Sequence, residues 1–329
     1  MTFLEACRAW LKVSGDIPVG LTVILEGDEE NRSEPVNEFL AKFKSELKAD
    51  AALVCDSGQW DRETPAVTTM LRGMFHEEIV VRCANRDLHS GLYGGAAQNP
   101  AHVIAHIIAD LKGRDGKIKI PGFYKGVKPL PKKQLAEWKK LKLTEKDFLG
   151  PIGLKKSQGE KAYSLIEHIT SRPTCDVNGI WCGYQGEGCK TVIAAEAHAK
   201  VSFRLVGEQN TEWLQKAFRK FVRERVPKDC SVEFLETRGG EPVSLPTDSP
   251  MVQKACKALA EEWGRKTVVM GSGGSVPVVT EIKNRLGIDS LLVGFGLEDD
   301  CLHSPNEKYD LSSFHHGTRS WARILQALA

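Results

Sequence analysis

The feature that most constrains the fold is the alternation of short apolar runs with amphipathic helical patterns at both ends of the chain. Buried strands that alternate with helices form largely parallel sheets with helices on their faces. The two ends therefore predict an α/β domain with a largely parallel sheet. We expect its helices over about 2–13, 34–48, 250–264, 276–285 and from 311 onward, and its strands over 19–25, 51–55, 267–270 and 289–294.

The middle of the chain has a different pattern. Strands are expected over 78–83, 195–206 and 231–235, and helices over 99–111 and 211–226, which is typical of a compact α+β domain. A polar stretch rich in Lys and Pro, about 113–160, is interpreted as an insertion with one helix. We therefore expect one α/β domain split into 1–70 and 246–329, with a second domain inserted over 71–245.

Composition excludes several classes of partner. The net charge is +2, with 41% hydrophobic and 27% charged residues, which favours neither nucleic acid nor a membrane surface as a partner. The first residues lack the basic and apolar regions of a secretory signal. Nine scattered cysteines without a CxxC pair indicate reduced thiols and a cytoplasmic location.

Acidic residues and a histidine follow three of the expected α/β strands. Glu26-Gly-Asp-Glu-Glu30 follows 19–25, Asp56 follows 51–55, and His303 follows 289–294. Open α/β sheets place ligands at the carboxyl ends of their strands. Crowded carboxylates repel one another unless a cation is present, and Asp, Glu and His suit zinc or manganese. The alternative is a solvated acidic turn before a helix, with Asp56 in an Asx turn.

One further histidine lies in a glycine-rich segment of the inserted domain, Asp87-Leu-His-Ser-Gly-Leu-Tyr-Gly-Gly95. Glycines allow the backbone to approach a ligand closely. His89 is thus either a functional side chain or a surface histidine in a loop.

Together these segments resemble the carnosinase, glutamate-carboxypeptidase, aminoacylase and succinyl-diaminopimelate desuccinylase family of co-catalytic zinc hydrolases, and bacterial dipeptidases of the carnosinase type above all. The similarity covers essentially the whole chain. Its motifs are Glu26-Gly-Asp-Glu-Glu, Cys55-Asp-Ser, Asp87-Leu-His-Ser-Gly-Leu-Tyr-Gly-Gly, Gly186-Glu-Gly-Cys-Lys-Thr-Val-Ile, Ser202-Phe-Arg-Leu-Val, Gly273-Gly-Ser-Val-Pro and His303-Ser-Pro-Asn-Glu-Lys.

The resemblance implies a hydrolase with two divalent metal ions, zinc first, with manganese or cobalt as alternatives. Glu29 matches the general base that activates a metal-bridging water. Glu30 and His303 match ligands of one metal, and Asp56 matches a ligand of the other. A metal-activated water would then cleave the amide bond of a dipeptide or similar small peptide.

The resemblance also implies roles for the inserted domain, which matches the family's dimerisation lid. His89 matches a histidine that reaches into the partner subunit's site and supports the oxyanion. Arg204, with Gly274 and Ser275 from the last part of the chain, matches groups that contact the substrate's carboxylate end. A homodimer formed through 71–245 is therefore expected.

The sequence departs from the family pattern near its start. The family carries a His-x-Asp motif and then a bridging Asp upstream of the Glu pair, and neither motif occurs between Met1 and Gly27. Asn31-Arg-Ser33 also replaces the usual Ile-Gly-Ser. We therefore expect the α/β domain to be incomplete at its N-terminus, by on the order of 100 residues.

Three functional hypotheses follow. The first is a dipeptidase-like metallopeptidase. The second is a catalytically inactive truncated homologue that acts only as a dimerising module, and the missing His-x-Asp is the feature that separates it from the first. The third is an N-acyl-amino-acid deacylase, which shares the metal residues and differs only in its substrate.

Overall fold

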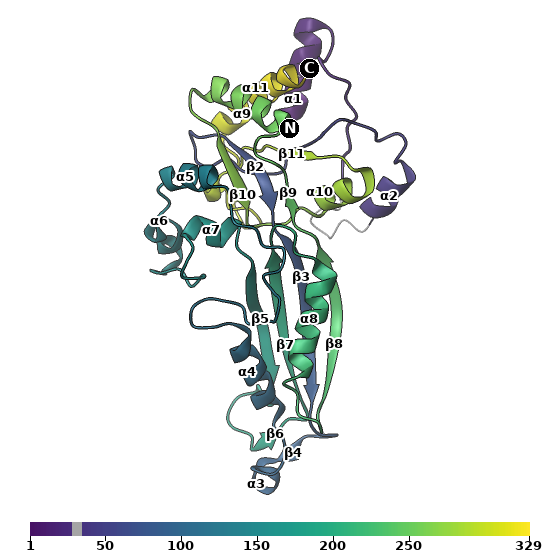
Figure 1. The fold of residues 1–329 in the computed structure, drawn as a ribbon, viewed down its shortest axis with the longest axis vertical. Helices are drawn as coiled ribbons and strands as arrows, with labels where there is room; N and C mark the ends of the chain where they lie inside the picture. The colour runs from purple at the N-terminus through teal and green to yellow at the C-terminus, as the bar shows by residue number, and fades with distance from the viewer. Residues whose placement is uncertain (28–34) are drawn as a thin grey trace. The chain divides into compact units, whose positions relative to one another are not determined.

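The computed structural model describes residues 1–27 and 35–329, and the chain divides into two compact units. The first unit comprises residues 1–71 and 243–329, and the second comprises residues 72–242 (Figure 1). No helix in the described ranges combines the length and the apolar character that a bilayer crossing requires.

The first unit is built on a five-stranded sheet with β1, β11, β2 and β10 in that order, and β9 also pairs with β2. β1 is parallel to β11 and β2 is parallel to β10, whereas β2 runs antiparallel to β11 and β9. Its elements are α1 (Thr2–Ser14), α2 (Val36–Lys42), β1 (Ala52–Val54), β2 (Ala66–Leu71), β9 (Val243–Ser244), α9 (Pro250–Trp263), β10 (Val268–Ser272), α10 (Pro277–Glu281), β11 (Ser290–Leu292) and α11 (Leu311–Leu328).

The core of the first unit lies where α1, α9 and α11 pack against the sheet. Trp321 on α11 is fully buried, and the ring of Phe3 on α1 meets it edge-on at 5.2 Å between centroids. The side chain of Glu262 on α9 is 4% exposed and accepts hydrogen bonds from Arg319 and Arg323 on α11. Apolar packing holds the two long helices on the sheet, and this buried carboxylate joins them to each other.

The second unit is built on a four-stranded antiparallel sheet with the order β5-β7-β3-β8 (Figure 1). A separate two-stranded pair joins β4 to β6. Its elements are β3 (Gly73–Arg82), β4 (Leu88–His89), α3 (Ser90–Tyr93), α4 (Pro100–Leu111), α5 (Lys132–Lys140), α6 (Glu145–Leu149), α7 (Leu165–Thr170), β5 (Thr174–Cys182), β6 (Val192–Ile193), β7 (Glu196–Leu205), α8 (Thr211–Arg223) and β8 (Ser231–Gly240).

The core of the second unit follows from the alternation along β7. Val201, Phe203 and Leu205 are fully buried and pack against apolar side chains of α4 and α8. Their neighbours Lys200 and Arg204 point to the other face of the sheet, because successive side chains of a strand alternate. One face of the sheet is thus covered by helices, and the other carries charged side chains.

The expected α/β fold class is confirmed, and helices expected over 2–13, 99–111, 211–226, 250–264 and from 311 correspond to α1, α4, α8, α9 and α11. Pro100 is at the first turn of α4, where the missing N–H costs no hydrogen bond.

Some expectations were wrong. Residues 19–25 form no strand, and Val23, Ile24 and Leu25 are 50%, 41% and 84% exposed. An apolar run becomes a strand only where a neighbouring strand shares its backbone hydrogen bonds, and these residues join none of the three described sheets. The helix expected over 34–48 is limited to α2 within the described residues, and the stretch 113–160 contains α5 and α6 rather than one helix. β2, β5 and α7 were not expected.

Candidate active site

Asp56 and His303 follow two strands that are parallel neighbours. Val54 of β1 is the register partner of Leu292 of β11, and the pairing continues beyond both strands. Val293 N donates to Val54 O at 3.1 Å, and Gln59 N donates to Gly296 O at 3.0 Å. Both segments therefore leave the sheet at the same edge, and both Asp56 and His303 are exposed.

Buried polar atoms lie directly beside Asp56. The Ser57 hydroxyl and both polar atoms of the Gln59 amide are buried and have no hydrogen-bond partner among the described residues. Buried polar groups are almost always paired, so such atoms mark places where water or a ligand completes the bonding. A water or a ligand would therefore complete the bonding of Ser57 and Gln59.

His303 lies in a loop with an unusual backbone. Cys301, His303 and Asn306 have φ values of 57°, 58° and 62°. Side chains other than glycine rarely adopt this left-handed conformation, and it is concentrated at functional sites. The loop leaves His303 exposed between two segments of fixed structure, the short helical turn Glu298–Asp300 and α11.

Gly274 and Ser275 follow β10, whose direction is opposite to that of β1 and β11. Gly274 N donates to the Ser272 hydroxyl at 3.1 Å, which turns the chain toward α10. The sheet itself therefore does not bring these two residues to Asp56. α10 instead packs against α2, the helix that follows residues 28–34. Glu29 and Glu30, the expected general base and metal ligand, lie outside the described residues.

His89 is held by the small sheet of the second unit. It pairs with Val192, and Ser90 N donates to Thr191 O at 3.1 Å. Its Nδ1 accepts a hydrogen bond from Gly91 N at 3.0 Å, so a neutral His89 carries its proton on Nε2. The backbone thus leaves an exposed imidazole with an N–H donor directed away from its own turn.

Arg204 lies on the open face of the four-stranded sheet, opposite Met74 of β3 and Thr174 of β5. Arg72 directly precedes β3, and its guanidinium donates to the carbonyl oxygens of His168 and Arg172 at 3.4 Å each. Burial lowers the pKa of Arg72 to about 10, and the positive charge of Arg204 adds to this effect. Two guanidinium groups therefore share one end of the sheet.

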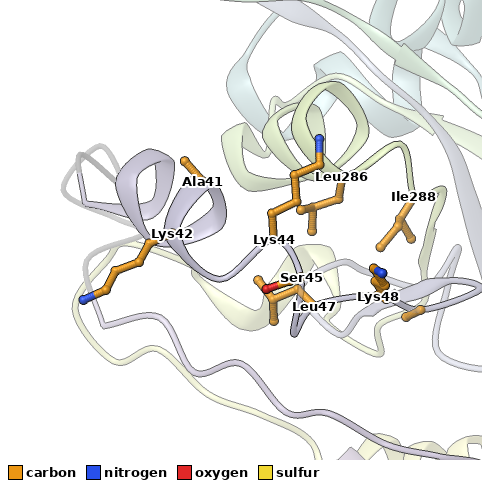
Figure 2. Close-up of a pocket in the computed structure, with 9 residues that line it drawn as sticks. Ala41, Lys42, Lys44, Ser45, Leu47, Lys48, Leu286 and Ile288 are labelled. Carbon is orange, nitrogen blue, oxygen red and sulfur yellow. The ribbon is translucent and has the colours of Figure 1, made fainter.

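One depression of the first unit lies away from Asp56 and His303. It has a volume of about 590 Å³ between α2, the turn that follows it and residues 286–288 (Figure 2). Lys42, Lys44 and Lys48 line it together with Leu47, Leu286 and Ile288. Of the expected site residues that the structure describes, none lines this depression, so its shape does not locate the chemistry.

The donor chemistry of Asp56 and that of His303 each fit a divalent metal. A carboxylate oxygen and an imidazole nitrogen are ordinary zinc ligands, and Ser57 and Gln59, whose buried polar atoms have no partner among the described residues, follow Asp56 in the sequence. Within residues 1–27 and 35–329, no three His, Cys, Asp or Glu side chains converge closely enough to hold a metal ion. Complete coordination therefore needs donors beyond this set, of which Glu30 is one candidate.

Sequence reasoning missed the side chains that hold these loops. Arg72, Asp300 and Lys308 act through partners that only the fold brings together. The signal for the last two was the group of acids before His303 and the lysine five residues after it. The spacing alone does not separate such a pair from solvated surface charges.

Comparison with known proteins identifies the relatives of this chain. Residues 1–327 match the model of peptidase family M20/M25/M40. The chain is 30% identical to the Cys-Gly metallodipeptidase DUG1 of Saccharomyces cerevisiae, over 96% of this chain and 67% of that protein. It is 25% identical to the human Beta-Ala-His dipeptidase, over 100% of this chain and 66% of that protein.

A solved structure gives the same result. The M20 family metallo-carboxypeptidase Sso-CP2 of Sulfolobus solfataricus superposes with a TM-score of 0.84 at 25% identity, over 99% of this chain and 74% of that one. The chain thus spans about two thirds of the length of the curated relatives that it matches. With the family match extending over nearly every residue, the chain belongs to peptidase family M20/M25/M40.

Proposed function

We propose that this chain is a metal-dependent dipeptidase that hydrolyses the amide bond of dipeptides or similar small peptides. The observation that carries the proposal is the similarity over 96% of the chain to a protein named as a Cys-Gly metallodipeptidase. The common edge from which the Asp56 and His303 segments leave the sheet supports it. Both curated relatives reported above are named as dipeptidases. This supports the dipeptidase hypothesis over the deacylase hypothesis and over the non-catalytic one.

Glu30 and His303 would hold one metal ion and Asp56 the other, and we propose that both ions are zinc. When bound, such ions supply Lewis acidity toward a carbonyl oxygen and lower the pKa of water. Glu29 would accept the proton of the attacking water and pass it to the leaving amine.

The second unit would supply substrate contacts. The Nε2–H of His89 would donate to the oxygen on which negative charge develops, because Nδ1 is already engaged by Gly91 N. Arg204 would bind the free carboxylate of the peptide, for which a planar guanidinium is well suited. Gly274 and Ser275 would contact the same end of the substrate.

We propose further that residues 72–242 act as the dimerisation lid and that the chain is a homodimer. Leu92 and Tyr93, which follow His89 on α3, are 77% and 41% exposed and would be covered in such an assembly. A cytoplasmic location is part of the proposal, supported by nine cysteines that are all free thiols.

The test is hydrolysis of a panel of dipeptides and N-acetyl amino acids by the purified 329-residue chain, with Zn²⁺ or Mn²⁺ added. Dipeptides are expected to be cleaved only with metal, and Glu29→Gln is expected to lower kcat by roughly 10²- to 10⁴-fold. Glu46→Gln, an exposed carboxylate of the same unit, is the matched control and should leave kcat unchanged. Cleavage of N-acetyl amino acids in preference to dipeptides, or no metal-dependent cleavage at all, would contradict the proposal.

A further inference from the structure

The loop that carries His303 is closed at its base by an ion pair between the buried carboxylate of Asp300 and the partly exposed Lys308. Lys308 Nζ lies 2.8 Å from Asp300 Oδ1, and Lys308 N donates to Asp300 O at 3.0 Å. The other carboxylate oxygen of Asp300 accepts from Leu297 N at 2.7 Å. The Asp300 side chain is 1% exposed, so its charge is removed from water and needs these partners.

The backbone inside this closed loop contains most of the described left-handed residues other than glycine. Of the four described residues other than glycine with positive φ, three lie between Asp300 and Lys308, and His303 is one of them. Such conformations persist only when surrounding contacts over-determine them. Within the loop, the backbone bond from Ser304 N to Cys301 O at 3.0 Å is a local tie, and Asp300 and Lys308 fix the two ends.

A second layer of charges connects this loop to the segment after β1. Lys308 also lies 3.3 Å from both Asp299 and Asp310. Arg62, six residues after Asp56, donates to Asp299 at 2.9 Å and also pairs with Asp310. The same network therefore ties the segment that carries Asp56 to the loop that carries His303.

We propose that Asp300 and Lys308 are positioning residues that hold His303 in its ligating orientation, with Arg62 fixing the Asp56 segment relative to the same loop. The inference rests on the proposed role of His303 as a metal ligand. Groups behind a metal ligand set its direction, and their loss typically weakens metal binding by roughly 10- to 100-fold. The pair would act through the loop backbone and would not touch the substrate.

The experiment compares Asp300→Asn and Lys308→Met in the 329-residue chain with two references. His303→Ala removes the proposed ligand itself. Lys283→Met breaks an exposed pair of the same unit, in which Lys283 Nζ lies 2.6 Å from Asp289, and controls for the loss of a lysine charge. Zn²⁺ affinity is measured by equilibrium dialysis, the visible spectrum is recorded with Co²⁺, and amide hydrogen exchange is followed over residues 301–307.

Asp300→Asn and Lys308→Met are expected to weaken Zn²⁺ binding roughly 10- to 100-fold, alter the Co²⁺ spectrum and speed exchange of the loop. Lys308→Arg, which keeps the cation, should recover part of the affinity, and Lys283→Met should behave as the unaltered chain. If either variant fails to fold, Arg62→Met, an exposed side chain, provides the same comparison with a milder loss.

Two results would overturn the inference while leaving the proposed function intact. One is faster exchange with unchanged affinity and spectrum, which would make the pair structural only. The other is no change in any readout, although His303→Ala loses binding. If His303→Ala binds Zn²⁺ as well as the unaltered chain, the proposed metal role of His303 fails, and the inference fails with it.

Discussion

Val54 and Leu292 are register partners in the parallel pair β1/β11, and the segments after them approach closely at Ser57 and Gly294. A Cβ on Gly294 would overlap the backbone carbonyl of Ser57, so only glycine fits this close approach without a shift of the backbone. The close approach of the Asp56 segment to the chain that leads to His303 thus depends on one missing side chain.

Gly294→Ala is therefore expected to force the two segments apart. Overpacking of a closed contact costs about 1–3 kcal/mol of unfolding free energy, and we expect a loss of this size, with weaker Zn²⁺ binding. Urea unfolding and equilibrium dialysis measure the two effects. Gly20→Ala has open space for its Cβ in the same unit and is the control. Equal stability of the two variants would show that the close approach of Gly294 to Ser57 tolerates a side chain.

The long helices of the first unit could be predicted because their apolar spacing depends on local sequence alone. α9 and α11 repeat apolar residues on one face, and both form where expected. The strand expected over 19–25 was wrong because strand formation depends on a partner that periodicity does not reveal. β5 was not predicted from the sequence, because its polar residues form a strand only through their register with β7.

The candidate site was also predicted only in part. That the segments carrying Asp56 and His303 leave the sheet at the same edge follows from their places after two parallel strands, which the sequence pattern predicted. The supporting groups did not follow, because Arg62 and Asp299 are 237 residues apart in sequence and meet only in the fold. Glu29 and Glu30 lie outside the described residues, so their roles stay predictions.

Glu262→Gln should destabilise the first unit in a pH-dependent way. Burial alone would raise the pKa of Glu262, but hydrogen bonds from Arg319 and Arg323 outweigh it and hold the pKa below its ordinary value of 4.5. A lowered pKa in the folded state adds stability that is present above 4.5 and is lost as the pH falls through the folded value.

The variant is thus expected to be about 1–3 kcal/mol less stable at pH 7, and the difference should shrink as the pH falls from 5 to 3. Urea unfolding at several pH values measures it. Glu261→Gln, on the exposed face of the same helix, should show almost no change at any pH. A deficit that does not vary with pH would mean that the carboxylate charge is not what joins α9 to α11.

His89→Ala is expected to lower kcat by roughly 10²- to 10³-fold with little change in KM, since a donor to developing negative charge acts mainly in the transition state. Steady-state kinetics on a cleaved dipeptide measures the split. His102→Ala, an exposed histidine on α4, is the control. A rise in KM at constant kcat would assign His89 to substrate binding instead.

Arg204→Met tests which end of the substrate the second unit binds. If its guanidinium binds the free carboxylate, kcat/KM should fall by roughly 10- to 200-fold for a dipeptide, which corresponds to the 1.5–3 kcal/mol of a charged hydrogen bond. The same dipeptide with an amidated C-terminus has no carboxylate to lose and should be affected far less.

Arg114→Met removes an exposed arginine of the same unit and should change neither substrate. An equal loss on the acid and the amide would mean that Arg204 supports the sheet end that it shares with Arg72 rather than the carboxylate. Burial and the positive charge of Arg204 lower the pKa of Arg72, and a carboxylate beside these two cations would offset their repulsion, so a selective loss on the acid is the expected result.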